Sequence, residues 1–121
     1  MGEGILVDTD VLIEYSKGLL ELPFAPLYIT EITLYEFIRG TKDIGEAKKA
    51  LEEGFIVLFH DNAVIKKASE MWVELKNAGC LLDDRDILIA AVAITNNLRL
   101  ITKNTKHFKK LEKFGLRFAE E

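Results

Sequence analysis

The chain has 121 residues, of which 49% are hydrophobic and 30% are charged, with a formal net charge of −4. These values indicate one globular domain over residues 1–121 and exclude a disordered, collagen-like or low-complexity chain. No apolar run approaches the ~20 residues that span a bilayer, and the N-terminus lacks the basic start of a secretory signal. We therefore expect no membrane contact and a cytoplasmic location, and the acidic balance excludes a uniformly basic nucleic-acid coat.

Short apolar runs that end in polar residues predict three strands in the first half of the chain, at 4–7, 27–30 and 55–59. A short helix over 11–15 follows the first strand, with Thr9 and Asp10 placed to cap it. Thr30 is placed to cap a second helix over 31–39, and an amphipathic helix over 43–53 comes before the third strand.

In the second half, apolar residues recurring every three or four positions predict a long helix over 61–77 with Met71 and Trp72 in the core. Residues 87–96 are apolar on nearly all sides, which is typical of a fully buried helix. A strand at 98–101, a basic helix over 105–114 and a weak strand at 116–118 complete the pattern. The alternation predicts a three-layer α/β/α fold with a mainly parallel sheet of four to five strands, in an order that the pattern leaves open.

Polar residues stand where each predicted strand ends. Ligands of parallel sheets bind beyond the carboxyl ends of the strands, so these residues are candidates for one shared site. They are Asp8 and Asp10 after the first strand, Thr30 with Glu36 behind it, Asp61, and Thr102, Lys103 and Asn104 after the fourth strand. Three further acids open the buried helix: Asp83, Asp84 and Asp86.

Carboxylates that gather at one place repel one another, so they either raise their pKa values or bind a cation. Sets of oxygen ligands favour Mg²⁺ or Mn²⁺ over zinc, and the two histidines, His60 and His107, stand isolated from any zinc set. Such an ion activates water and neutralises charge on a phosphodiester. The acids therefore indicate phosphodiester chemistry.

Each acid also has a plainer interpretation. Asp86 is placed to N-cap the buried helix, and Asp83 and Asp84 are typical turn residues. Nothing in the helical pattern turns Glu36 inward, so a solvated glutamate is the simpler hypothesis for it. Asp8 is harder to explain in this way, because a carboxylate at the end of a buried strand is costly unless it is paired or bound to metal.

The stretch from 103 to 113 carries five lysines and one acid. This pattern fits either a phosphate-binding face beside the strand ends or an ordinary solvated helix surface, and the residues do not separate the two.

Four segments, in order along the chain, resemble the PIN-domain family, and most of all its small VapC-type toxin ribonucleases. They are LVDTDVLI at 6–13, TEITLYEFIRG at 30–40, DILIAA at 86–91 and LITKNTKHF at 100–108. Each segment is weak alone, whereas four in order are a specific signal. The resemblance implies a PIN-like fold and a metal-dependent endoribonuclease that is the toxin of a toxin–antitoxin pair.

The resemblance also implies residue roles. Asp8, Glu36 and Asp86 match the acids that hold one or two Mg²⁺ or Mn²⁺ ions, and Thr102 matches a hydroxyl that supports the first acid. Asn104 stands where many members have a fourth acid, which places the second metal position in question. Additional candidate ligands are Asp10, where the family usually has asparagine, and Asp84.

Partners follow from the same resemblance. It implies an RNA substrate, an antitoxin protein whose tail covers the acidic pocket, and a homodimer. Charge alone suggests that RNA lies against Lys103, Lys106, Arg85 and Arg39.

Two other functions remain open at this point. Residues 6–11 also resemble the first motif of haloacid-dehalogenase-type phosphatases, with Asp8 as nucleophile and Asp10 as general acid/base. That hypothesis leaves Glu36, Asp86 and the segment 102–108 unexplained. A PIN-like module that binds RNA or protein without cleaving it is the second alternative, because one fold hosts many functions.

Overall fold

The computed structural model describes residues 3–119. Five parallel strands form one sheet in the order β3-β2-β1-β4-β5. The strands are β1 (Ile5–Val7), β2 (Leu27–Thr30), β3 (Ile56–Leu58), β4 (Arg99–Ile101) and β5 (Arg117–Phe118). The helices are α1 (Thr9–Ser16), α2 (Glu31–Ile38), α3 (Ile44–Gly54), α4 (Asn62–Asn77), α5 (Asp84–Thr95), α6 (Thr105–Phe108) and the 3₁₀-helix η1 (Lys109–Phe114).

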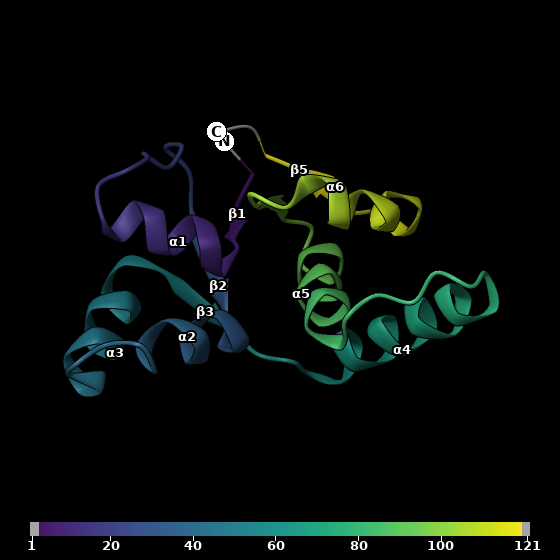
Figure 1. Cartoon of the computed structure of the whole chain (residues 1–121), viewed down its shortest axis with the longest axis horizontal. Helices are drawn as coiled ribbons and strands as arrows, with labels where there is room; N and C mark the ends of the chain where they lie inside the picture. The colour runs from purple at the N-terminus through teal and green to yellow at the C-terminus, as the bar shows by residue number, and fades with distance from the viewer. Residues whose placement is uncertain (1–2, 120–121) are drawn as a thin grey trace.

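The predicted three-layer α/β/α architecture is confirmed. Figure 1 shows α1, α2 and α3 on one side of the strands and α4, α5 and α6 on the other. Neighbouring residues of β1 point to opposite faces, so Leu6 joins the α4–α5 core while Val7 joins the core beneath α1 and α3. The sheet is therefore buried on both faces, as its nearly continuous apolar strands predict.

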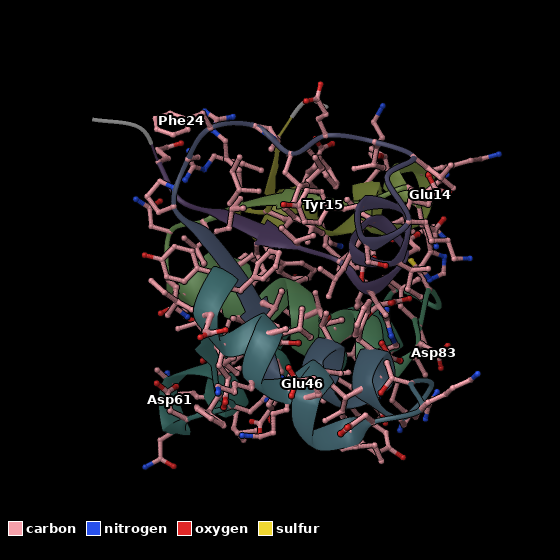
Figure 2. The ribbon with its side chains drawn as sticks, turned by 90° about the vertical axis from the view of Figure 1, so that its left-hand side faces the viewer. Glu14, Tyr15, Phe24, Glu46, Asp61 and Asp83 are labelled. Atoms are coloured by element: carbon pink, nitrogen blue, oxygen red, sulfur yellow. The ribbon has the colours of Figure 1, made fainter. Side chains whose placement is uncertain are left out.

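The layer that contains α1, α2 and α3 faces the viewer in Figure 2. Two of its aromatic side chains, Tyr15 and Phe24, are exposed to solvent.

The strand order, which the sequence pattern left open, creates a crevice between β1 and β4. The chain first adds β2 and β3 on one side of β1 and then crosses over to place β4 and β5 on the other side. Connections from neighbouring strands then leave toward opposite faces, and the space beyond their carboxyl ends stays open. Asp8 and Thr102 directly follow β1 and β4, so both stand at this crevice.

Three of the described helices begin just after a residue whose side chain caps the first turn. The side chains of Thr30, Asp43 and Asp61 accept hydrogen bonds from backbone N–H groups in the first turns of α2, α3 and α4. The first helix is present, but its predicted caps were wrong, because Asp8 caps α1 and both Thr9 and Asp10 lie inside it. The helix predicted over 105–114 is divided into α6 and η1.

Helix α5 begins at Asp84, three residues earlier than the predicted start. Asp83 occupies its N-cap position without a side-chain cap bond, so the interpretation of Asp86 as the N-cap is wrong. The charged residues of the first turn hid this start, since they carry no apolar period.

The α4–α5 packing corrects one core prediction. Met71 is fully buried against α5, whereas Trp72 is 37% exposed at the edge of the same contact. Adjacent residues lie about 100° apart on a helix, so Trp72 reaches only the edge of the contact that Met71 fills. None of the helices described in residues 3–119 has the length and apolar character needed to cross a membrane.

Candidate metal centre

Asp8 is the acid at the centre of the crevice. Its backbone N–H donates to the Ile101 carbonyl oxygen at 3.0 Å, which extends the β1–β4 pairing by one step. The residue is only 3% exposed. Its Oδ1 accepts from the Thr9 N–H at 2.8 Å, and its Oδ2 accepts from the Thr102 hydroxyl at 2.8 Å. Asp8 is therefore held rigidly by the end of one strand, the start of α1 and the end of the neighbouring strand.

Glu36 reaches the crevice from the second turn of α2. The Thr30 hydroxyl fixes the start of that helix by accepting from the Thr33 N–H at 3.1 Å. Glu36 Oε1 then lies 2.7 Å from the Thr9 hydroxyl oxygen. Burial opposes the charged form, but hydrogen bonds from Arg85 and Thr9 outweigh it and lower the pKa of Glu36. The hypothesis of a simple solvated glutamate is thus wrong.

Asp86 enters from the first turn of α5 and is 7% exposed. Its Oδ1 accepts from Arg85 Nη1 at 2.8 Å, and its Oδ2 lies 2.9 Å from His107 Nε2. His107 is therefore paired with a carboxylate, although within residues 3–119 it belongs to no group of ligands that could hold a metal ion. His107 follows Thr102 by five residues, and the short helix α6 turns it back over the crevice, a placement for which the sequence offers no periodic signal.

Two more of the expected residues line the same crevice: Asp10 and Asn104. Asp10 Oδ1 accepts from the Val11 N–H at 2.8 Å. Burial, and next the negative charge of Asp8, raise the pKa of Asp10 above its usual value. The Asn104 N–H donates to the Thr102 hydroxyl oxygen at 3.0 Å, so the loop after β4 orients the hydroxyl that holds Asp8.

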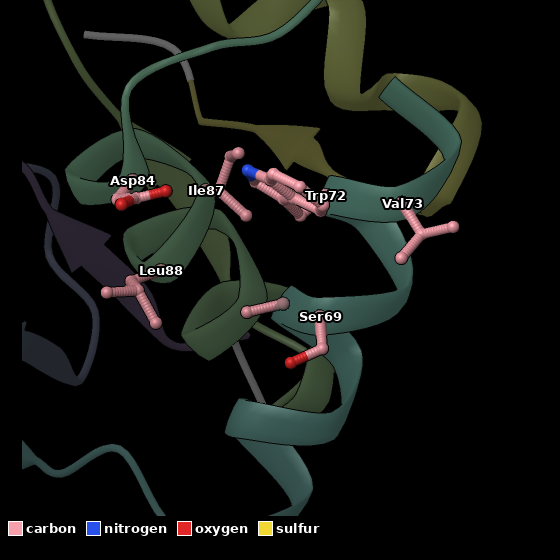
Figure 3. A pocket seen from close by; sticks show the side chains of 7 residues that line it. Ser69, Trp72, Val73, Asp84, Ile87 and Leu88 are labelled. Carbon is pink, nitrogen blue, oxygen red and sulfur yellow. The ribbon is translucent and has the colours of Figure 1, made fainter. Parts of the chain in front are cut away.

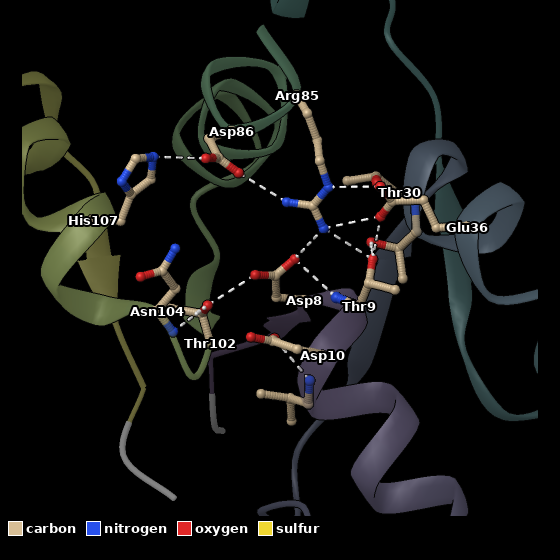
Figure 4. Close-up of polar contacts among 12 residues, drawn as sticks. Asp8, Thr9, Asp10, Thr30, Glu36, Arg85, Asp86, Thr102, Asn104 and His107 are labelled. Atoms are coloured by element: carbon tan, nitrogen blue, oxygen red, sulfur yellow. Dashed lines mark hydrogen bonds and ion pairs between the residues drawn. The ribbon is translucent and has the colours of Figure 1, made fainter. Parts of the chain in front are cut away.

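Arg85 stands between the acids, a position that charge patterning alone did not predict. Figure 4 shows its guanidinium surrounded by the carboxylates of Asp8, Glu36 and Asp86. The Arg85 nitrogens lie 2.9 Å from Asp8 Oδ1, 2.8 Å and 2.9 Å from the two Glu36 oxygens, and 2.8 Å from Asp86 Oδ1. Burial opposes its charge, yet the bond to Glu36 and the charge of Asp8 raise the pKa of Arg85 further.

Of the other expected residues, only Arg39 lines this crevice within residues 3–119. Asp84 lines a separate, mainly apolar hollow of about 290 Å³ between α4 and α5, next to Trp72 and Ile87 (Figure 3), so the structure does not bring it to the crevice. Lys103 forms an ion pair with Glu14 on α1. Lys106 is exposed on α6, and Arg39 lines the crevice.

The chemistry of the crevice suits a hard divalent cation, because several carboxylates supply oxygen atoms around a position that a cationic group already occupies. The oxygens are spread around that guanidinium. In residues 3–119, no three His, Cys, Asp or Glu side chains form a group that could hold a metal ion as arranged. The carboxylate oxygens are therefore of the type that binds Mg²⁺ or Mn²⁺, but as arranged they are spaced around the Arg85 guanidinium.

Comparison with known proteins agrees with this geometry. The family model described as PIN domain matches residues 5–113, which include all the carboxylates of the crevice. This chain belongs to the PIN-domain family. The match decides against the haloacid-dehalogenase alternative, which would have required Asp8 and Asp10 as nucleophile and acid.

Relatives of this PIN domain carry ribonuclease names. A protein of Methanocaldococcus jannaschii named Ribonuclease VapC1 is 39% identical over 119 residues, which cover 97% of this chain and 88% of that protein. A Ribonuclease VapC1 of Rickettsia felis is 24% identical and covers about nine-tenths of both chains.

Among solved structures, a chain of the DNA-bound VapBC complex from Salmonella typhimurium superposes with a TM-score of 0.78 at 25% identity, covering 98% of both chains. A chain of VapBC-1 from nontypeable Haemophilus influenzae gives a TM-score of 0.75 at 23% identity and 97% coverage of both, which shows the shared fold.

Proposed function

We propose that this PIN domain is a metal-dependent endoribonuclease that hydrolyses RNA phosphodiester bonds and is the toxin of a toxin–antitoxin pair. The observation that carries the proposal is the convergence of three carboxylates, 28 to 78 positions apart in the sequence, on one cationic group. Its curated relatives named Ribonuclease VapC1 support the substrate class.

We propose Asp8, Glu36 and Asp86 as the ligands of Mg²⁺ or Mn²⁺, with Asp10 adding negative charge beside Asp8. An ion held there lowers the pKa of a bound water and neutralises charge on the phosphodiester. The Thr102 hydroxyl holds Asp8 Oδ2 and keeps that carboxylate aimed into the crevice. Asn104, in the loop after β4, lines the side of the crevice where a fourth acid is common in the family.

The RNA path is proposed from charge. Arg39 lines the crevice on the α2 side, and Lys103 and Lys106 lie on the α6 side, so the acids are flanked by positive groups that attract phosphates. Arg85 is bonded to the acids and meets a phosphate only after it leaves them. The protein partners are proposed from the VapBC complexes to which the fold is similar: an antitoxin that covers the acidic crevice, and a second copy of the chain.

The direct test is cleavage of single-stranded RNA by the full chain in Mn²⁺, in Mg²⁺ and in EDTA, with a phosphomonoester as second substrate. We expect RNA cleavage that requires the ion and falls at least about 10²-fold in Asp8→Asn. Asp43→Asn is the matched control, because Asp43 caps the exposed start of α3 and an asparagine caps equally well.

Other outcomes would contradict the proposal. RNA binding without cleavage in any metal would favour the non-catalytic binding module, and phosphomonoester turnover would restore the phosphatase alternative. Full cleavage by Asp8→Asn would show that the acidic crevice is not the site of the reaction.

A further inference from the structure

Arg85 uses almost all of its donor groups on the acids of the crevice. Nε and Nη2 both bond Glu36, Nη1 bonds Asp86, and Nη2 also bonds Asp8. The planar guanidinium matches this set because its N–H groups fan out in fixed directions toward separate carboxylates. Asp8 and Asp86 are almost fully buried, so their carboxylates depend on protein donors such as Arg85 rather than on bulk water.

We propose that Arg85 is a built-in counter-cation that takes the position of the divalent ion in the metal-free protein and must withdraw when the ion binds. The inference rests on the proposed metal-dependent function, and it adds a residue that competes for the metal position. It also gives Arg85 two successive partners, since a guanidinium released at the mouth of the crevice is free to meet a phosphate.

The spacing of the oxygens is the first argument. Carboxylate oxygens bind Mg²⁺ at about 2.0–2.1 Å, so ligands of one ion lie close to one another around it. Here the oxygens of Asp8, Glu36 and Asp86 each face an Arg85 nitrogen at 2.8–2.9 Å and surround a group of four heavy atoms. The space between them is filled by the guanidinium, and an ion that binds these same oxygens must displace it.

Charge is the second argument. Arg85 balances only one of the three carboxylates; His107 lies beside Asp86, and Asp10 adds a further acid to the crevice. A divalent ion neutralises the group better than Arg85 does, so exchange is favourable. Without either cation, buried like charges repel one another and destabilise the fold. Arg85 therefore stabilises the metal-free protein and weakens metal binding through the same contacts.

The test compares Arg85→Ala and Arg85→Lys with the wild type, using Mn²⁺ affinity by calorimetry and Tm in EDTA. We expect Arg85→Ala to bind Mn²⁺ at least about tenfold tighter. Its Tm in EDTA should fall by about 5–10 °C, and saturating Mn²⁺ should restore it. Arg85→Lys should lie between the two, because an ammonium keeps the charge but does not span three carboxylates.

Arg39→Ala is the matched control. Arg39 lines the same crevice and lies 5.0 Å from the Tyr35 ring centroid, and within residues 3–119 no carboxylate accepts a hydrogen bond from it. Its removal deletes the same charge without emptying the metal position, so we expect less than about a threefold change in Mn²⁺ affinity.

A measurement on the wild type covers the case in which Arg85→Ala does not fold. The Arg85 Nε–H resonance, assigned by its loss in Arg85→Lys, should shift strongly or disappear from its position when Mg²⁺ saturates the protein. An unchanged resonance at saturation would overturn the inference.

The outcomes separate this inference from the function on which it rests. Mn²⁺ binding that is equal or weaker in Arg85→Ala overturns the counter-cation and leaves the nuclease proposal standing. Tighter binding without RNA cleavage by any form supports the counter-cation and overturns the nuclease. Absence of Mn²⁺ binding in every variant overturns both.

Discussion

Two clusters of arginine and carboxylate groups lie at opposite ends of the same parallel sheet. At the carboxyl ends of the strands, Arg85 is shared among three acids that are largely buried. At the amino ends, a single acid, Glu3, is shared between Arg99 and Arg117, with distances of 2.6 Å and 2.8 Å. In the second cluster all the side chains are between 35% and 45% exposed.

The difference shows what burial and charge balance contribute. The Glu3 cluster has one positive charge in excess, and water and salt ions reach it freely, so it requires no further ligand. The Arg85 cluster carries an excess of negative charge, and the side chains of Asp8 and Asp86 are only 4% and 10% exposed although Arg85 itself is 32% exposed. Such an imbalance is costly to fold, and it is satisfied by a second cation. The Glu3 cluster ties three strand starts together, whereas the Arg85 cluster is built to exchange one cation for another.

The largest expected contrast comes from neutralising one acid in each cluster. Asp86→Asn should lower RNA cleavage at least about 10²-fold while leaving Tm unchanged or raised, because repulsion among the acids is relieved. Glu3→Gln should leave cleavage unchanged, since Glu3 lies at the far end of the sheet. Cleavage rates and thermal melts of both variants check this prediction, and equal losses of activity would erase the functional distinction between the clusters.

Thr102→Val tests the support of Asp8 without altering charge. Valine has the shape of threonine but leaves Asp8 Oδ2 and the Asn104 N–H without the bonds they make to this hydroxyl. Because Asp8 and Thr102 are buried, we expect a loss of about 1–3 kcal/mol in the free energy of unfolding, measured by urea denaturation. Thr105→Val is the control, since Thr105 is exposed and forms only a 3.5 Å contact. A loss of the same size in both variants would contradict the role of Thr102.

Asp10→Asn should change stability in the opposite direction. Burial and the charge of Asp8 raise the folded-state pKa of Asp10 above its ordinary value of 3.8, so the ionised side chain destabilises the metal-free fold. Between the ordinary pKa of Asp10 and its raised pKa in the folded state, the folded protein binds more protons than the unfolded chain. The free energy of unfolding therefore falls as the pH rises through this range. We expect Asp10→Asn to raise Tm by a few degrees at pH 7 in EDTA.

The same substitution gives a check by pH titration. The rise in Tm caused by Asp10→Asn should shrink as the pH falls through the raised pKa of Asp10 and should vanish below about pH 3.8. Thermal melts across this range measure it. A gain that stays constant with pH would show that charge is not its cause.

The smallest expected effect is the salt dependence of the exposed cluster. Glu3→Gln should lower Tm slightly at low ionic strength and not measurably in 1 M NaCl, because salt screens exposed pairs. The fall in Tm of Arg85→Ala should persist in 1 M NaCl, since its partners are buried. If 1 M NaCl removed both effects on Tm, salt would screen the two clusters equally, and the contrast between a buried and an exposed cluster would be wrong.

The strands and most helices were predictable because their signals are local. The apolar runs gave β2 at its observed bounds, Leu27–Thr30, and Thr30 caps α2 as its hydroxyl and position suggest. The same reasoning placed the candidate acids at strand ends. It failed for the start of α5, where charged residues hide the period, and for Trp72, whose apolar character does not reveal which side of α4 it occupies.

By itself, the sequence determined the α/β alternation, the family motifs and the identity of the acids, because each depends on residues close together in the chain. Tertiary structure decided the strand order, the inward turn of Glu36, the approach of His107 to Asp86 and the central place of Arg85. These depend on contacts between residues up to 94 positions apart, such as the pairing of Ile5 with Arg99. No local periodicity encodes such contacts, since they arise only when the crossover from β3 to β4 brings α5 beside the end of β1.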